Sequence, residues 1–154
     1  MNEPFTAGDI CTRIVTVAFP SMALNEAARL MRDHHVGCLV VVEEKSLEER
    51  MVVGMLTDRD IAIGVVAEDR DPHGMRVGDV MSRDVVTARE QDSLQDLLSA
   101  MRRKAVRRIP VVSPQNVLLG IVTLDDVLEV LAQEMQTAAA AVSAASHHEH
   151  TALP

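Results

Sequence analysis

Apolar and polar residues alternate along this chain in an order that occurs twice. Apolar side chains at positions 24, 27, 28 and 31 share one face of a helix, as do those at 94, 97, 98 and 101. This pattern predicts amphipathic helices over residues 22–34 and 93–104. A run of mostly β-branched residues follows each helix, at 39–42 and 109–112, and such short apolar runs are typical of buried strands.

Other elements complete the same order in both halves. They are expected at residues 14–17, 51–57 and 58–66 in the first half, and at 85–87, 117–123 and 124–135 in the second. Pro110 cannot donate a backbone hydrogen bond, so we expect it at a strand start or a sheet edge. Each half is therefore a β-α-β-β-α unit, and the fold class is α/β, with helices and strands mixed.

The two halves also share individual residues. Gly54-Met55-Leu56-Thr57-Asp58-Arg59-Asp60 returns 66 positions later as Gly120-Ile121-Val122-Thr123-Leu124-Asp125-Asp126, whereas matches upstream lie 70 positions apart. The polar stretch 43–50 accounts for the four extra residues in the first copy. Self-similarity at a nearly fixed offset indicates a repeat architecture and predicts two quasi-equivalent sites.

The repeats divide the chain into five segments. We expect an N-terminal tail at 1–8, a first repeat at 9–70, a turn-rich connection at 71–78 and a second repeat at 79–135. Residues 136–154 begin with an Ala-rich stretch that prolongs the last helix. From residue 146 onward no apolar periodicity remains, so we expect a disordered tail there.

Composition narrows the classes of function. The 154 residues include no Trp or Tyr and only two Phe, which argues against stacking of single-stranded nucleic acid on aromatic side chains. The net charge of −8 disfavours polyanionic partners. No apolar run approaches the roughly 20 residues of a membrane span, and no cleavable signal precedes the first repeat. The sequence thus predicts no nucleic acid, no membrane and a cytoplasmic location, with Cys11 and Cys38 as free thiols.

The repeated motif Gly-x-x-Thr-x-x-Asp falls where a strand meets a helix. Thr57 with Asp60, and Thr123 with Asp126, have the spacing of a capping box, which satisfies free amides at a helix start. The same groups can bind a nucleotide, because a helix N-terminus and a hydroxyl suit phosphate and a carboxylate can accept from a ribose diol. No phosphate-cleaving Gly-x-x-x-x-Gly-Lys-Ser/Thr loop is present. Both interpretations remain open at the level of the motif.

A cluster of cations precedes the second motif. It consists of Arg102, Arg103, Lys104, Arg107 and Arg108. These side chains fit the solvated end of a helix, where they complement the helix dipole, and they equally fit a small anion site beside the second motif. The aligned Gly37 and Cys38 of the first repeat carry no charge, whereas Arg59 lies inside the first motif. The two clefts are therefore expected to differ in affinity.

Two such repeats, each ending in Gly-h-h-Thr-x-x-Asp (h apolar) and with Arg107-Arg108-Ile109-Pro110 in the second, resemble a tandem pair of CBS (cystathionine-β-synthase-type) domains. The resemblance covers roughly residues 9–135 and extends to small stand-alone bacterial members with signal-transduction or stress-response roles. It implies a pseudo-two-fold pair with two clefts for adenosine-containing ligands, and a homodimer.

The resemblance also implies roles for particular residues. It places the ribose at Asp60 and Asp126. It places the phosphates at Thr57 and Thr123, together with nearby cations, here Arg59, Arg107 and Arg108. It gives no residue-by-residue assignment for the adenine, which in such clefts lies against backbone and aliphatic side chains.

The favoured hypothesis is a non-catalytic sensor. Binding of AMP, ADP, ATP, NAD or S-adenosylmethionine shifts its conformation, an unidentified protein partner responds, and no cofactor is required. The alternative hypothesis is an interaction or assembly protein with empty clefts, in which Thr and Asp only cap helices. An enzyme or metal-dependent redox protein is least favoured, since no nucleophile accompanies Asp58 and Asp60. The run 147–150 contains three His, and any metal that it binds is interpreted as adventitious.

Overall fold

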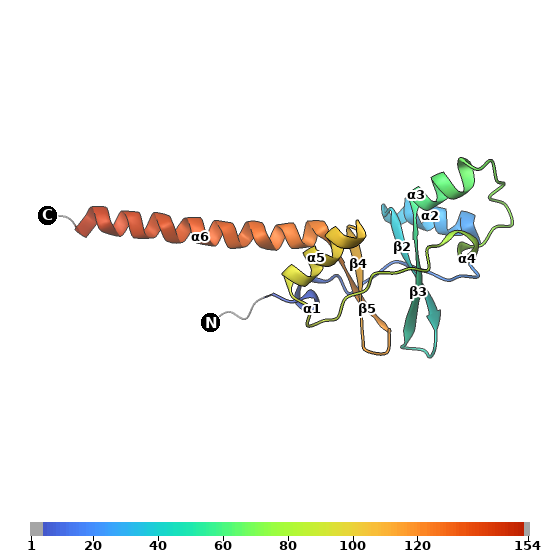
Figure 1. Ribbon diagram of the computed structural model, residues 1–154, viewed down its shortest axis with the longest axis horizontal. Coiled ribbons are helices and arrows are strands. Elements are labelled where there is room, and N and C mark those ends of the chain that lie inside the picture. Colours follow the sequence, from blue (N-terminus) through green and yellow to red (C-terminus); the bar gives the residue numbers. More distant parts are fainter. Residues whose placement is uncertain (1–4, 153–154) are drawn as a thin grey trace.

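The computed structural model describes residues 5–152, in which two α/β halves lie side by side and one long helix projects from the body (Figure 1). The helices are α1 (Ala7–Ile10), α2 (Leu24–His34), α3 (Asp58–Ile61), α4 (Val77–Val80), α5 (Leu94–Lys104) and α6 (Leu124–Ala152), with a π-helical turn, η1, at Ala62–Val66. The strands are β1 (Val17–Ala18), β2 (Cys38–Glu44), β3 (Arg50–Thr57), β4 (Arg108–Val112) and β5 (Leu118–Thr123). The α/β class and the repeated units predicted from the sequence are confirmed.

The first half is built on a three-stranded sheet in the order β1-β2-β3, with β1 parallel and β3 antiparallel to β2. The first five residues of β2 are all buried, because the sheet is covered on both faces. On one face Leu39 and Val41 share a core with α2, while on the other Val40 and Val42 pack with Val112 of the second half. The sheet therefore joins the two halves as well as forming the first.

The second half has an antiparallel pair, β4 and β5, and a single residue in place of β1. Ala88 forms a parallel bridge with Val111, in which Ala88 N donates to Pro110 O at 2.9 Å. Pro110 lies inside β4, and its missing donor faces this sparsely paired side of the strand. The pairing at 17–18 and at 88 falls later than the extended pieces expected at 14–17 and 85–87, because Val15 and Val85 pack between the two sheets instead.

Each half completes its core with the short helix that opens the other half. Ala7 of α1 is fully buried in the core of the second half, beside Leu97 of α5. Val77 of α4 is fully buried in the core of the first half, beside Leu24 of α2. The segment that opens each repeat thus belongs to the core of the other repeat.

This exchange corrects the N-terminal tail expected at residues 1–8. Thr6 is the N-cap of α1, and its backbone N–H donates to Asp9 Oδ2 at 2.9 Å. The signal was present in the sequence as a Thr-x-x-Asp spacing at 6–9, the same spacing as in the two motifs. Residues 1–4 lie outside the described part of the chain.

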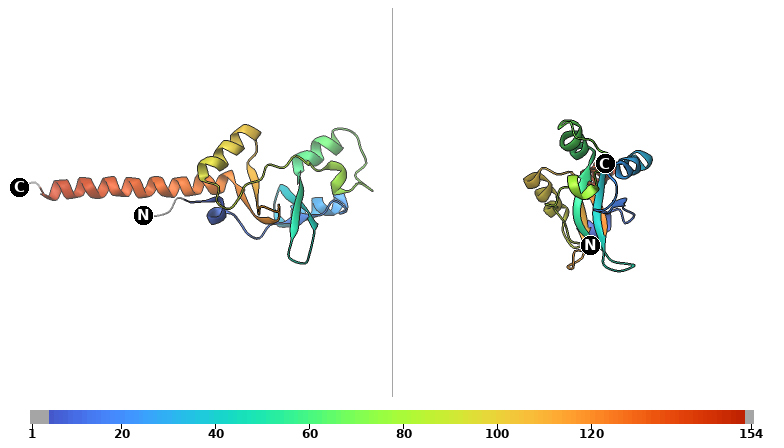
Figure 2. Two further views of the ribbon diagram at one scale, coloured as in Figure 1. Left: turned by 60° about the horizontal axis from the view of Figure 1, so that its bottom comes forward. Right: turned by 90° about the vertical axis from the view of Figure 1, so that its right-hand side faces the viewer.

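A pseudo-two-fold axis relates the two halves. The bridge between Thr12 and Ile121 is equivalent to the one between Ser82 and Met55 at the offsets read from the sequence. Met51 bridges Val117, and these two residues are equivalent to each other, so their bridge lies on the axis. The two hairpins, β2–β3 and β4–β5, accordingly lie side by side with their turns at the same end (Figures 1 and 2).

The helices α2, α5 and α6 begin within two residues of their predicted starts, whereas the short helices α1 and α4 were not predicted. The helix expected over 58–66 is α3 continued by η1. The disordered tail expected from residue 146 is wrong up to Ala152, because α6 extends that far; Ala favours the helix without any tertiary contact, and no Gly or Pro interrupts the run. Within residues 5–152, no helix has both the length and the apolar character needed to cross a membrane.

Candidate functional site

The first motif forms the start of α3. Asp60 N donates to Thr57 Oγ1 at 3.0 Å, and Thr57 N donates to Asp60 Oδ2 at 2.9 Å. This is the reciprocal capping box that the spacing predicts. It uses one carboxylate oxygen of Asp60, whereas Oδ1 has no hydrogen-bond partner among residues 5–152. Capping therefore leaves part of this carboxylate free for another group.

The second motif has the same geometry at the start of α6. Thr123 N donates to Asp126 Oδ2 at 2.9 Å, and Asp126 N donates to Thr123 Oγ1 at 3.1 Å. A third box of this kind, between Ser93 and Asp96, caps α5. Capping is therefore a recurrent role of such pairs in this chain, and the pair alone does not identify a ligand site.

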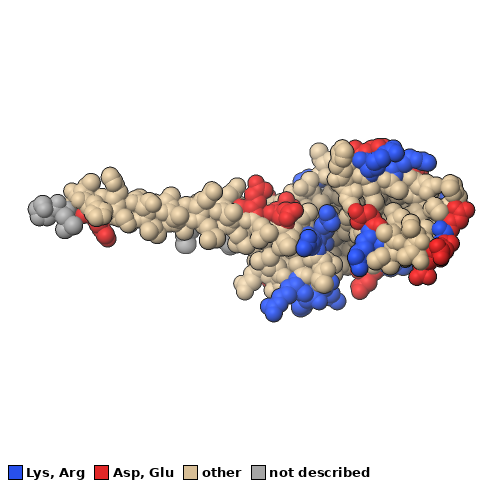
Figure 3. Space-filling view, turned by 90° about the horizontal axis from the view of Figure 1, so that it is seen from above, with Lys and Arg blue, Asp and Glu red and all other residues tan. Residues whose placement is uncertain are grey.

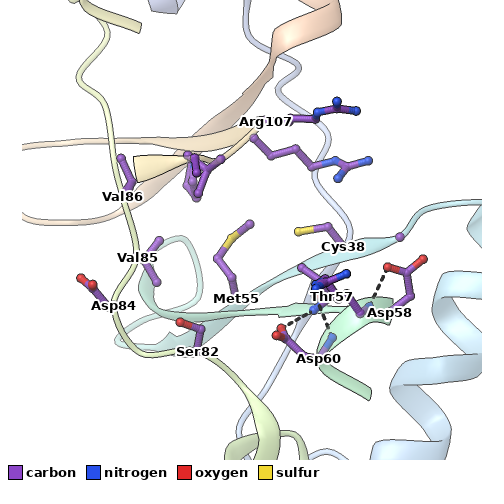
Figure 4. Close-up of a pocket in the computed structure, with 16 residues that line it drawn as sticks. Cys38, Met55, Thr57, Asp58, Asp60, Ser82, Asp84, Val85, Val86 and Arg107 are labelled. Carbon is purple, nitrogen blue, oxygen red and sulfur yellow. Dashed lines mark hydrogen bonds between the residues drawn. The ribbon is translucent and has the colours of Figure 1, made fainter. Parts of the chain in front are cut away.

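A cavity of about 400 Å³ lies at the first motif. Thr57 and Asp60 lie on one wall, and Arg107 lies on the facing wall, which comes from the second repeat (Figure 4). Met55 of β3 and Val85 of the connecting segment give this space an apolar lining. The cavity thus brings together residues from both repeats, as the pseudo-two-fold arrangement requires.

The cations of this cavity come mainly from the second repeat. The side chains of Arg107 and Arg108 line it, together with Arg59 of the first motif. The main chain of Arg107 lies at the second motif, since its carbonyl oxygen accepts from Leu124 N at 2.8 Å. The two arginines expected beside the second motif line the cavity of the first motif, and Arg107 also borders a groove beside Leu124 of the second motif.

Sequence reasoning missed several residues of the cavity. Asp58 and Asp84 add carboxylates, Ser82 adds a hydroxyl, and Cys38 adds a thiol. Asp58 Oδ1 accepts from Arg59 N at 2.8 Å. Ser82 and Asp84 belong to the segment exchanged between the repeats, so their place could have been found only by recognising that exchange.

Burial raises the pKa of the Cys38 thiol to about 11. The nearby Arg108 lowers this pKa, while the carboxylates of Asp60 and Asp58 add to its rise. Cys38 is therefore a neutral thiol near pH 7 and contributes a weakly polar surface to the cavity.

The cleft at the second motif has a different composition. Thr123 and Asp126 line none of the cavities described within residues 5–152. Cys38 pairs with Thr57 in the first sheet, and Arg108 pairs with Thr123 in the second, so the counterpart of the Arg108 side chain at this cleft is that of Cys38. The two clefts therefore differ in charge.

No group of three or more His, Cys, Asp or Glu side chains in residues 5–152 is arranged to hold a metal ion.

Comparison with known proteins gives a consistent result. The profile of the CBS domain family matches residues 7–67 and 77–133. CBS domain-containing protein YhcV of Bacillus subtilis is 40% identical over 136 residues, which cover 88% of this chain and 91% of YhcV. An uncharacterized protein of Methanopyrus kandleri, MK0525, is 34% identical over 125 residues, 81% of this chain but only 62% of its own length.

A solved structure resembles the fold. The crystal structure of the CBS domain pair of protein MJ0100, in complex with 5′-methylthioadenosine and S-adenosyl-L-methionine, superimposes with a TM-score of 0.70 at 25% identity. The match covers 82% of this chain and 98% of that one.

Proposed function

The chain belongs to the CBS domain family, and from that premise we propose that it is a non-catalytic regulatory module that binds an adenosine-containing nucleotide between its two repeats. The observation that carries the proposal is the cavity of about 400 Å³ that places Thr57 and Asp60 opposite Arg107 and Arg108. Its volume lies within the roughly 300–1,000 Å³ usual for small-molecule sites. The structure relative MJ0100 binds two adenosine compounds, which supports this class of ligand.

The phosphate end of the ligand is proposed to meet the two arginines. Their guanidinium groups present several donors in a fixed plane, which suits the oxygens of a phosphate. Thr57 lies across the cavity from them and adds a hydroxyl at a helix start. Arg59 is a third cation for a second or third phosphate, so AMP, ADP and ATP all fit this proposal.

The ribose end is proposed to meet Asp60. Its Oδ2 already caps α3, and Oδ1 can accept from a ribose hydroxyl without disturbing that cap. The adenine is proposed to lie on the apolar lining formed by Met55, Val85 and Val86. Such a lining suits a flat heterocycle in a protein with two aromatic residues.

We propose one principal nucleotide site in each chain. The second cleft has the same Thr and Asp but not the two arginines, because Gly37 and Cys38 occupy the equivalent positions. A polyphosphate bound there would have fewer cations to neutralise it. The second cleft is thus proposed to bind more weakly, or to prefer an uncharged or cationic adenosine compound.

The module is proposed to act as a homodimer in the cytoplasm. A nucleotide can shift its conformation only if it binds one arrangement better than another. The cavity lies between the repeats, so its occupant contacts both and favours one relative placement of them. We also propose that a protein partner binds one of these placements selectively and that the module catalyses no reaction.

Titration calorimetry with AMP, ADP, ATP, NAD and S-adenosylmethionine tests the proposal. We expect at least one compound to bind near one per chain, and the double variant Arg107→Ala/Arg108→Ala to weaken binding of a phosphorylated compound at least tenfold, since charge-assisted hydrogen bonds contribute about 1.5–3 kcal/mol each. Arg103→Ala is the matched control, because Arg103 is exposed on α5 and lines no described cavity. Binding of no compound would overturn the proposal.

The second candidate is an assembly protein whose clefts stay empty. The observation that favours it is the capping box itself, which both motifs share with Ser93 and Asp96, a pair that lines none of the described cavities. In that case the calorimetry would show no heat, and substitution of either motif Asp would affect only stability.

A further inference from the structure

The projecting part of α6 carries an apolar stripe that the body of the protein does not cover. Every residue from Leu131 to Ala152 is exposed. Met135 is 74% exposed and Val142 is 67% exposed. The family match ends at residue 133, so most of this helix lies beyond the repeat. Large apolar side chains held in water on a rigid helix indicate a surface for another protein.

The stripe has the spacing of a coiled coil. Its members, at alternating steps of four and three, are Leu124, Leu128, Leu131, Met135, Ala138, Val142 and Ala145. This is the a/d pattern of a helix that packs along a second helix, sustained over three heptads. The stripe begins at the body of the protein, where Leu124 is half-buried, and ends in solvent, where Ala145 is exposed.

The inner end of the stripe opens into an apolar groove. Leu98, Met101 and Leu124 line this groove between α5 and α6, and Arg102 and Arg107 also border it. Stripe and groove therefore form one continuous surface with apolar residues along its length and cations at its inner end.

The charges along α6 decide the direction of a partner helix. Asp125, Asp126, Glu129 and Glu134 all lie in its first half, while its second half carries Glu149 and three His. Figure 3 shows the acidic side chains gathered at the base of the helix and an uncharged surface along most of its length. A parallel copy would set the acidic halves against each other, whereas an antiparallel copy separates them.

The sizes of the side chains favour the same direction. In an antiparallel pair with Leu131 opposite Val142 of the other copy, Leu128 faces Ala145 and Met135 faces Ala138. Each of these three layers then combines a larger side chain with a smaller one, so the two helices keep an even separation. In a parallel pair Ala would face Ala, and the outer layers would be thin.

We propose that α6 pairs antiparallel with the α6 of a second copy of this chain through this stripe. The inference rests on the proposed homodimer and names the surface that forms it. In this register the last turn of the partner's helix reaches the groove beside Leu124. The negative end of that helix dipole, with its Glu149, then lies near Arg102 and Arg107.

Sedimentation velocity on the full chain tests the surface. We expect the wild-type chain to be a dimer and Met135→Glu/Val142→Glu to weaken dimerisation at least tenfold. The matched control is Gln133→Glu/Ala140→Glu, which adds the same charge on the opposite side of the same helix and should leave the dimer intact. All four positions are exposed, so folding should be unaffected, and circular dichroism checks the helix content. A monomeric wild-type chain, or an equally dimeric Met135→Glu/Val142→Glu variant, overturns the proposal.

Disulfide trapping tests the direction. Leu131→Cys and Val142→Cys should cross-link when the two variants are mixed under oxidising conditions, and neither should cross-link alone, because a disulfide needs Cα atoms within about 7 Å. Cross-linking of Leu131→Cys alone would establish a parallel pair instead. The unsubstituted chain, with its native Cys11 and Cys38, is the control for background.

Nucleotide calorimetry on the same variants separates this inference from the proposed ligand site. A Met135→Glu/Val142→Glu monomer that still binds nucleotide supports both. Loss of dimer in a protein that never binds nucleotide supports the pairing and contradicts the ligand site.

Discussion

Gly120 lies so close to Cys11 that a Cβ at position 120 would come within 2.7 Å of Cys11 Sγ and 2.8 Å of the Thr12 carbonyl oxygen. Gly54 has the same relationship to Met81, whose Sδ would be 2.8 Å from a Cβ there. Both glycines open a motif, and both make room for the segment exchanged from the other repeat. The glycine of the motif therefore serves backbone packing and not a ligand.

Gly120→Ala and Gly54→Ala should each lower the free energy of unfolding by about 1–3 kcal/mol, because overpacking a tight contact forces backbone or side chains to move. Urea unfolding measures the effect. Gly64→Ala is the control, since the nearest atom to its added Cβ would lie at an ordinary 3.8 Å. Equal stability of Gly64→Ala and Gly120→Ala would contradict this explanation.

Ala105→Gly should raise the free energy of unfolding by about 0.5–1 kcal/mol. Ala105 ends α5 with φ of 53°, a left-handed conformation that costs a residue with a Cβ more than it costs glycine. Ala100→Gly, inside the same helix, should have the opposite effect of about 1 kcal/mol. Thermal and urea unfolding of both variants measure the sign of each change in stability. A loss of stability in Ala105→Gly would refute backbone strain at Ala105.

Cys38 should make stability depend on pH above about 9. Its pKa is raised from an ordinary 9.0 to about 11 by burial, so the folded state keeps the thiol proton longer than the unfolded state does. This contribution is complete below pH 9 and disappears between pH 9 and about 11, a loss of about 2–3 kcal/mol. Urea unfolding at several pH values should show a shallower decline for Cys38→Ala than for the wild-type chain. Parallel profiles would contradict the raised pKa.

Asp60→Ala and Asp126→Ala should separate capping from ligand binding. Each removes a capping carboxylate with the same geometry, so each should lose about 1 kcal/mol of stability. Only Asp60 lines the cavity with the two arginines, so Asp60→Ala should weaken nucleotide binding by roughly ten- to a hundredfold and Asp126→Ala should leave that site nearly unchanged. Equal losses of affinity would show that both clefts are filled; no loss in either would favour the assembly protein.

The repeat made most of the fold predictable. Its offset pairs α2 with α5 and β2 with β4, and apolar periodicity places each of them within a few residues. What the sequence did not reveal is the exchange of α1 and α4, because a segment of four residues has too little pattern to indicate which core it joins. The Thr-x-x-Asp spacing at Thr6 was readable but lay outside the expected repeat.

The sequence named residues of the candidate site but did not show how its cations are divided between the two clefts. Thr57, Asp60, Arg107 and Arg108 were all named, yet the arginines were expected beside Thr123. The reason is geometric: which cavity these arginines line depends on how the two repeats pack, and the pattern of one sequence does not show that packing. The heptad stripe of α6 was missed because Ala at two of its d positions conceals the pattern.

The helix α1 opens the first repeat in the chain but belongs to the core of the second, so neither repeat is a self-sufficient folding unit. A fragment beginning in the connection at 71–78 would leave Leu97 without the cover of Ala7. The two repeats are thus interlocked through their short opening helices. The molecule should accordingly melt in one step, and deleting its first dozen residues should damage the half that lies farthest along the sequence.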